Sequence, residues 1–122
     1  MMVDECYILL VEDDSSIRES LQELLDMEGY PVMAARHGKE ALELLESHPT
    51  KPCLILLDLM MPVMDGFDFL KAREASEMYR DVPLCVLSAV VDRSKLPEGL
   101  QYIAKPVDVD TLLEVVENSC RG

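Results

Sequence analysis

Residues 54–70 read LILLDLMMPVMDGFDFL and combine a strand pattern with a helical one. It opens with a run of aliphatic residues, which is typical of a strand buried on both faces in a parallel sheet. The run stops at one carboxylate, Asp58. A loop containing Pro62 and Asp65-Gly66 follows and leads into a helical pattern over residues 65–75. The stretch therefore predicts a strand, a loop and a helix, with a carboxylate placed where the strand ends.

The same alternation of strand and helix recurs along the whole chain. Strands are predicted by apolar runs at residues 6–11, 31–35, 53–58, 83–88 and 100–104. Helices are predicted by amphipathic patterns at residues 15–29, 38–47, 65–75 and 108–119. The first helix is expected to end at Gly29. Such alternation predicts an α/β fold, and right-handed crossovers favour a doubly wound five-stranded parallel sheet of order 2-1-3-4-5, the flavodoxin-like arrangement.

The connection between the last two predicted strands is short. Only residues 89–99, AVVDRSKLPEG, separate them, whereas a parallel crossover needs about a dozen residues or more. Pro97 interrupts helix and Glu98-Gly99 is typical of a turn. The remaining residues, 92–96, are too few for a helix that is stable alone. We therefore expect a shortened or irregular fourth helix of at most about two turns.

Length and charge restrict the class of protein. A chain of 122 residues suits a single domain over residues 1–122, and no output domain is visible. No apolar run is long enough to span a membrane, and the first residues, MMVDECYILLVEDD, carry acids where a signal peptide needs bases. We therefore expect a cytoplasmic protein. The net charge of −13 disfavours direct binding to nucleic acid or to anionic membrane, and favours cations or basic partners.

The cysteines and histidines do not predict a zinc site. His37 and His48 share no ligand spacing with a cysteine, and no CxxC pair occurs. Reduced thiols in or near the core are expected at Cys6, Cys53, Cys85 and Cys120.

Polar residues follow the predicted strands at the points where those strands end. They are Glu12, Asp13 and Asp14 after the first strand, Asp58 in the third, Ser88 in the fourth and Lys105 after the fifth. The carboxyl ends of parallel strands meet at one edge, and neighbouring strands lie about 4.8 Å apart. In the order 2-1-3-4-5, Asp13 and Asp58 are therefore expected to be neighbours at the crevice where such folds bind ligands.

Carboxylates this close together repel one another, by roughly 4 kcal/mol per pair at 4 Å and an effective dielectric constant of 20. One lysine does not offset three acids, whereas Mg²⁺, which prefers oxygen ligands and retains waters, does. Asp14 or Ser15 is expected to cap the first helix. Ser88 and Lys105 would hold the oxygens of an anion attached to Asp58. Together these groups suit phosphoryl transfer to a carboxylate.

Four segments with fitting spacing resemble the receiver domain of two-component response regulators, the CheY-like family. They are ILLVEDD (8–14), LLDLMMPVMDG (56–66), VLSA (86–89) and YIAKP (102–106). The resemblance covers nearly the whole chain. It implies that Asp58 is the phosphoacceptor, that Asp13 is a direct Mg²⁺ ligand and that Glu12 acts on the metal through water. It further implies that the Met60 backbone carbonyl is a metal ligand.

The resemblance also assigns roles at the ends of the last two predicted strands. Ser88 and Lys105 would hold phosphoryl oxygens, and Lys105-Pro106 stands where the family has a cis peptide bond. Tyr102 stands at the position of the family's switch aromatic, so Ser88 and Tyr102 are the expected switch residues. An ordinary half-buried strand tyrosine is the alternative for Tyr102, because tyrosine suits strands in any case.

The implied function is that of a phosphorelay receiver. A sensor histidine kinase or phosphotransfer protein donates a phosphoryl group to Asp58 in a Mg²⁺-dependent reaction, and the changed conformation regulates a downstream protein target. The domain is then a switch that also loses its phosphoryl group by itself, rather than a turnover enzyme. A monomer is expected, because the short connection at residues 89–99 removes much of a face that many receivers use to dimerise.

Two other classes of protein share parts of this pattern. A Mg²⁺-dependent phosphohydrolase with an aspartyl nucleophile would usually need a second acid at Met60 and a cap domain, and both are missing. A flavin carrier of the same topology would need a phosphate-cradling loop of Ser, Thr or Gly after the first strand. This chain has acids there.

Overall fold

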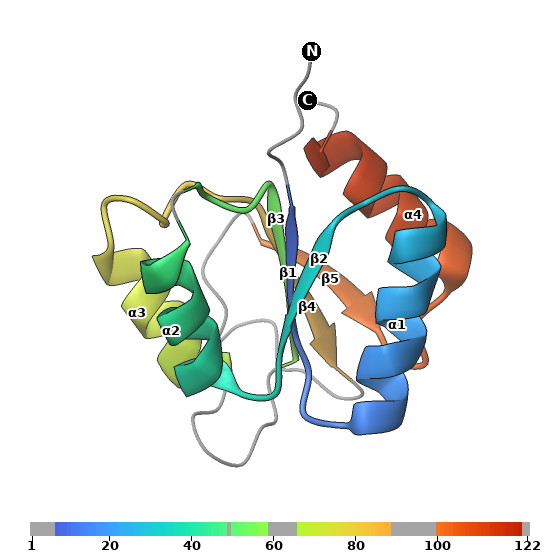
Figure 1. Ribbon diagram of the computed structural model, residues 1–122, viewed down its shortest axis with the longest axis horizontal. Coiled ribbons are helices and arrows are strands. Elements are labelled where there is room, and N and C mark those ends of the chain that lie inside the picture. The colour runs from blue at the N-terminus through green and yellow to red at the C-terminus, as the bar shows by residue number, and fades with distance from the viewer. Residues whose placement is uncertain (1–6, 49, 59–65, 89–99, 121–122) are drawn as a thin grey trace.

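The computed structural model describes residues 7–48, 50–58, 66–88 and 100–120 (Figure 1). Its strands are β1 (Ile8–Val11), β2 (Val32–Ala35), β3 (Leu54–Asp58), β4 (Leu84–Ser88) and β5 (Gln101–Ala104). Its helices are α1 (Ser15–Met27), α2 (Gly38–Ser47), α3 (Gly66–Ala75) and α4 (Val109–Cys120). Each element lies within two residues of the predicted position. The expected short fourth helix falls in residues 89–99, which lie outside the described residues.

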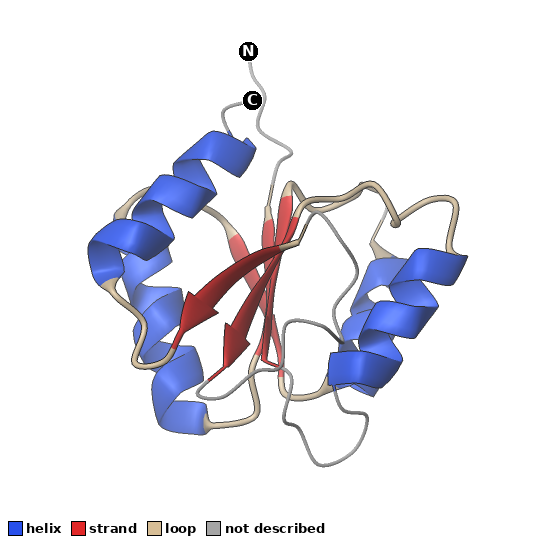
Figure 2. Cartoon of the chain, turned by 180° about the vertical axis from the view of Figure 1, so that it is seen from behind, coloured by secondary structure: helices blue, strands red, loops and turns tan. Residues whose placement is uncertain are grey.

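The five strands form one parallel sheet in the order β2-β1-β3-β4-β5, which confirms the predicted topology. Helices α2 and α3 cover one face and α1 and α4 cover the other (Figure 1). The view from behind shows the same three layers (Figure 2). Both faces of the sheet are therefore buried, which explains why the strands are almost continuously apolar.

The core consists of two apolar clusters separated by the sheet. Alternate residues of a strand point to opposite faces, so Leu9 packs with the α2 and α3 side while Leu10 packs with the α1 and α4 side. Phe69 of α3 belongs to the first cluster, and Leu25 of α1 and Leu112 of α4 belong to the second. All five side chains are fully buried. Burial on this scale stabilises the fold by roughly 1.5–3 kcal/mol per large apolar side chain.

Helix α1 is bounded by local signals that the sequence contains. At its start, the Asp14 side chain accepts a hydrogen bond from the Ile17 backbone N–H at 3.0 Å, as expected for a cap. Its last turn is closed by two backbone bonds, from Tyr30 N–H to Leu25 and from Gly29 N–H to Asp26, both 3.0 Å long. Gly29 adopts φ +90°, the left-handed conformation that favours glycine after a helix.

Helix α2 has a cap that the sequence did not indicate. The Nδ1 atom of His37 accepts a hydrogen bond from the Glu40 backbone N–H at 3.2 Å. The Glu40 carboxylate in turn accepts from the Arg36 backbone N–H at 2.7 Å and pairs with the Arg36 guanidinium at 3.1 Å. These contacts give His37 a structural role as the N-terminal cap of α2.

The prediction of reduced cysteines holds only in part. Cys85 and Cys120 are free thiols, but Cys53 forms a disulfide, so the prediction is wrong at Cys53. The remaining cysteine, Cys6, lies outside the described residues. In the part of the chain that the structure describes, no helix is long and apolar enough to cross a membrane.

Candidate phosphorylation site

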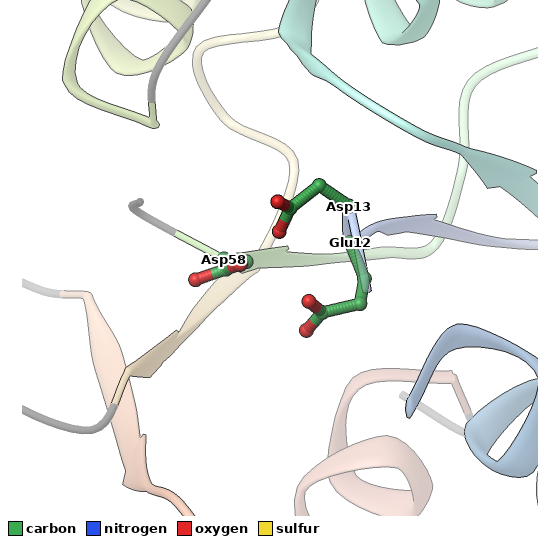
Figure 3. A group of neighbouring side chains, drawn as sticks. All are labelled: Glu12, Asp13 and Asp58. Carbon is green, nitrogen blue, oxygen red and sulfur yellow. The ribbon is translucent and has the colours of Figure 1, made fainter. Parts of the chain in front are cut away.

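Three carboxylates meet at the carboxyl edge of the sheet. Glu12 and Asp13 follow β1, and Asp58 ends the neighbouring strand β3. One oxygen from each of the three lies within 4.8 Å of the others. Figure 3 shows the Glu12 and Asp13 side chains leaving the end of β1 beside Asp58. The expected proximity of Asp13 and Asp58 is confirmed, and it arises because Val11 pairs with Leu57 in the parallel register.

The three acids differ in exposure. Glu12 is fully buried and Asp58 is 4% exposed, while Asp13 is exposed to solvent. The cluster thus combines two buried carboxylates with one that faces solvent.

Lys105 carries the positive charge that faces this cluster. Its Nζ atom lies 2.9 Å from Glu12 Oε1 and 3.6 Å from Asp58 Oδ2. Burial alone lowers the pKa of Lys105, but the hydrogen bond and charge of Glu12 and the charge of Asp58 outweigh burial, and the net shift is upward. Lys105 is therefore a firmly held ammonium group that offsets one of the three carboxylate charges.

The donor set that remains fits Mg²⁺. Two carboxylate charges are left over after Lys105, and all three acids offer oxygen atoms close together. Hard divalent cations bind such oxygens, and Mg²⁺ commonly takes one or two carboxylates and keeps its waters. The Glu12 carboxylate is already engaged by Lys105 and, at 3.2 Å, by the Asp14 backbone N–H, which suits a contact to the metal through water. The Met60 carbonyl lies outside the described residues.

The remaining predicted residues that the structure describes lie on β4, on β5 and directly after β5. Ser88 is 2% exposed at the end of β4, one position beyond the pair formed by Asp58 and Leu87. Its carbonyl accepts the Lys105 backbone N–H at 3.0 Å and the Tyr102 hydroxyl at 3.5 Å. Tyr102 is half-buried, and the Lys105-Pro106 peptide bond is cis, as expected from the resemblance.

One contact of the acidic turn was not predicted from the sequence. Arg18, one turn into α1, donates from Nη1 to the backbone carbonyls of Glu12 at 3.0 Å and Asp13 at 3.4 Å. The only sequence signal for this contact was the spacing of Arg18 from Glu12 and Asp13, because a side chain in the first turn of a helix can reach the residues that precede the helix. An arginine at that position is otherwise common on a solvated helix face.

A five-stranded parallel sheet with an acidic cluster, a lysine and a serine at its carboxyl edge defines a class of signalling domain. The family model for the response regulator receiver domain matches residues 8–117 of this chain. The chain belongs to the response regulator receiver domain family, and it is a receiver of the two-component signalling type.

Individual relatives agree with the family. The response regulator MprA of Mycolicibacterium vanbaalenii is 38% identical over 111 residues, which cover 87% of this chain and 46% of that protein. The transcriptional regulatory protein PdtaR of Mycobacterium tuberculosis is 36% identical over 118 residues, 90% of this chain and 54% of that protein. The chain thus spans about half the length of these relatives.

Solved structures show the same fold. The chemotaxis response regulator CheY4 of Vibrio cholerae superposes with a TM-score of 0.84 at 30% identity, covering 95% of this chain and 99% of CheY4. The receiver domain of the sensor histidine kinase PA1611 of Pseudomonas aeruginosa, which has a magnesium ion coordinated in its active-site cleft, gives a TM-score of 0.84 at 27% identity. That match covers 98% of this chain and all of the PA1611 domain.

Proposed function

We propose that Asp58 accepts a phosphoryl group from a histidine kinase or phosphotransfer protein, and that the phosphorylated domain binds a downstream protein differently. The observation that carries the proposal is the position of Asp58, at the end of a buried strand with Glu12, Asp13 and Lys105 around it. A carboxylate held this way is anchored by the sheet, with its oxygens close to the other two carboxylates and to Lys105.

Glu12, Asp13 and Asp58 are the residues that would hold Mg²⁺. The magnesium ion in the cleft of the PA1611 receiver domain supports this assignment. When bound, the ion supplies positive charge that offsets the carboxylates and the phosphoryl oxygens. This chemistry explains why a stable domain keeps three acids within 4.8 Å of one another.

In the proposed transfer, an Asp58 carboxylate oxygen attacks the phosphorus atom of the donor. The new bond joins that oxygen to phosphorus, and the bond between phosphorus and the donor's histidine nitrogen or acyl oxygen breaks with its electron pair. Lys105, 3.6 Å from Asp58, provides positive charge beside the transferred group. Ser88 supplies a hydroxyl at the neighbouring strand end. Water then hydrolyses the phosphorylated Asp58 in the same site, so the domain itself limits the lifetime of its phosphorylated form.

The conformational readout is proposed to run through Ser88 and Tyr102. The Tyr102 hydroxyl contacts the Ser88 carbonyl, so a shift of Ser88 toward a phosphoryl group changes the surroundings of the tyrosine ring. Tyr102 also packs against the cluster on the α2 and α3 side of the sheet. The ring therefore links the site to the end of the sheet formed by β4 and β5.

The partners follow from the family and the charge. A sensor histidine kinase or phosphotransfer protein is the proposed donor, and the target is a protein rather than nucleic acid, because a net charge of −13 repels phosphate backbones. We further propose that the described residues act as one receiver domain, as a monomer, in the cytoplasm.

The experiment is phosphorylation by acetyl phosphate with and without EDTA, followed by mass measurement of the intact protein. The expected result is one added phosphoryl group, present only with Mg²⁺ and absent in Asp58→Asn. Asp81→Asn, an exposed aspartate at the opposite edge of the sheet, is the matched control and should be phosphorylated normally. An adduct that persists in Asp58→Asn would refute the assignment. Sustained turnover of phosphate esters would instead favour the phosphohydrolase.

A further inference from the structure

Arg18 ties the start of α1 to the acidic turn. Its guanidinium donates to the carbonyls of Glu12 and Asp13, while its own backbone N–H donates to the Asp14 carbonyl at 2.8 Å. Arg18 is half-buried, and its contact to the Glu12 carbonyl is partly shielded from water while its contact to the Asp13 carbonyl is exposed. One side chain thereby bridges the two consecutive peptide units that carry the two acids.

The two acids depend on this bridge to different degrees. The Glu12 side chain is fixed by its own contacts, to Lys105 and to the Asp14 N–H. The Asp13 side chain is exposed, and among the described residues it has no hydrogen bond that orients it. The direction of the Asp13 carboxylate is therefore set by its backbone, and Arg18 holds the carbonyl of that backbone.

We propose that Arg18 is a positioning residue for Mg²⁺ binding: it holds the turn after β1 so that Asp13 presents its carboxylate toward Asp58. This inference rests on the proposed function, because it concerns the same metal site. Arginine suits the task because the two N–H groups of its Nη1 atom are fixed in the guanidinium plane, so that one nitrogen donates to both carbonyls.

The direction in which Mg²⁺ affinity changes when Arg18 is replaced separates positioning from simple electrostatics. Arg18 brings a positive charge close to a cation site, so by charge alone its removal strengthens Mg²⁺ binding. If Arg18 acts by positioning, its removal weakens binding, since groups that orient metal ligands typically contribute 10- to 100-fold in affinity. A neutral side chain of similar length distinguishes the two explanations by direction rather than by size.

The experiment measures the Mg²⁺ dissociation constant by calorimetric titration of the parent chain, Arg18→Met, Arg18→Lys and the control Arg80→Met. Arg80 is exposed and precedes β4 at the opposite edge of the sheet. We expect Arg18→Met to raise the dissociation constant on the order of 10-fold. Arg18→Lys, which keeps the charge but lacks the rigid guanidinium plane, should lie between the parent and Arg18→Met. Arg80→Met should match the parent.

Two further readouts exclude a merely structural role. Melting in EDTA identifies loss of stability, and a variant that is folded but binds Mg²⁺ weakly supports positioning. The acetyl phosphate reaction of Arg18→Met should approach the parent rate once Mg²⁺ is saturating. If Arg18→Met does not fold, the Mg²⁺ dissociation constant of Arg18→Lys tests the inference instead. An unchanged or smaller dissociation constant in the folded variants overturns the inference and leaves the proposed function standing, whereas a parent chain that binds no Mg²⁺ overturns both.

Discussion

Neutralising Asp58 is expected to stabilise the metal-free domain. The substitution Asp58→Asn keeps the size of the side chain and removes one charge from the acidic cluster. It relieves repulsion from Glu12 and Asp13 but also removes the attraction to Lys105. The net effect therefore depends on which of these opposing interactions is larger.

The distances decide the balance in favour of stabilisation. At 4.8 Å and an effective dielectric constant of 20, each of the two repulsions amounts to about 3.5 kcal/mol. The Lys105 attraction at 3.6 Å amounts to about 4.6 kcal/mol on the same scale. Repulsion thus exceeds attraction by roughly 2 kcal/mol, and solvent screening at the exposed Asp13 reduces the gain to about 1–2 kcal/mol.

Thermal and urea denaturation in EDTA at low salt measure this gain. For a chain of this size, about 1–2 kcal/mol corresponds to a rise in melting temperature of roughly 3–8 °C. Added salt should shrink the difference. Mg²⁺ should stabilise the parent more than Asp58→Asn, because at a given concentration a ligand stabilises the folded state more when it binds more tightly. Asp81→Asn provides the matched control and should change little. Equal melting temperatures of the parent and Asp58→Asn in EDTA would show that the acids are not in electrostatic conflict.

Three further predictions concern parts of the chain away from the acidic cluster. Gly29→Ala should lower the free energy of unfolding by about 1–2 kcal/mol in urea, because Gly29 has φ +90° while its added Cβ meets no atom within 4 Å; an unchanged value would mean that the turn relaxes. Burial raises the pKa of Cys85 to about 12 and that of Cys120 to about 11, so at pH 8 both should react slowly with a thiol reagent until urea unfolds the chain; rapid native labelling would contradict this. Hydrogen bonds from the Thr111 hydroxyl and backbone N–H hold the pKa of Asp108 below its ordinary value. The stability that this cap gives α4 is therefore complete above the ordinary pKa and is lost as the pH falls through the lowered one, so Asp108→Ala should flatten the acid limb of the stability curve, and an unaltered limb would exclude the cap as its cause.

The features that the sequence predicted well have local or topological causes. The strand bounds follow from continuous apolar runs, and the end of α1 follows from the conformation that Gly29 adopts after the helix. Asp14 was predictable as a cap, because a carboxylate before a helical pattern has a free N–H within reach. Asp13 and Asp58 were predictable neighbours, because parallel strands end at a shared edge.

The features that the sequence did not predict are contacts in which a side chain has several possible partners and the folded geometry determines which one it meets. The sequence predicted that Lys105 lies near the phosphoryl group, but its shortest contact is to Glu12. The strand order does not give the distances that determine which carboxylate Lys105 contacts. His37 caps α2 with a ring nitrogen, although polar oxygen atoms are the usual caps. The disulfide of Cys53 was also not predicted, because the positions of cysteines in a sequence do not say which thiols meet. Sequence spacing carries no information about these geometries.

The division of the core into two clusters makes residues that are adjacent in the sequence energetically independent. Leu9 and Leu10 are consecutive, yet they contribute to clusters on opposite faces of the sheet. Truncations of these two side chains should therefore be nearly additive, whereas Leu9 should couple to Ile55, which is 46 positions away but in the same cluster. A substitution in one cluster should therefore be compensated by a second substitution in the same cluster rather than by one across the sheet.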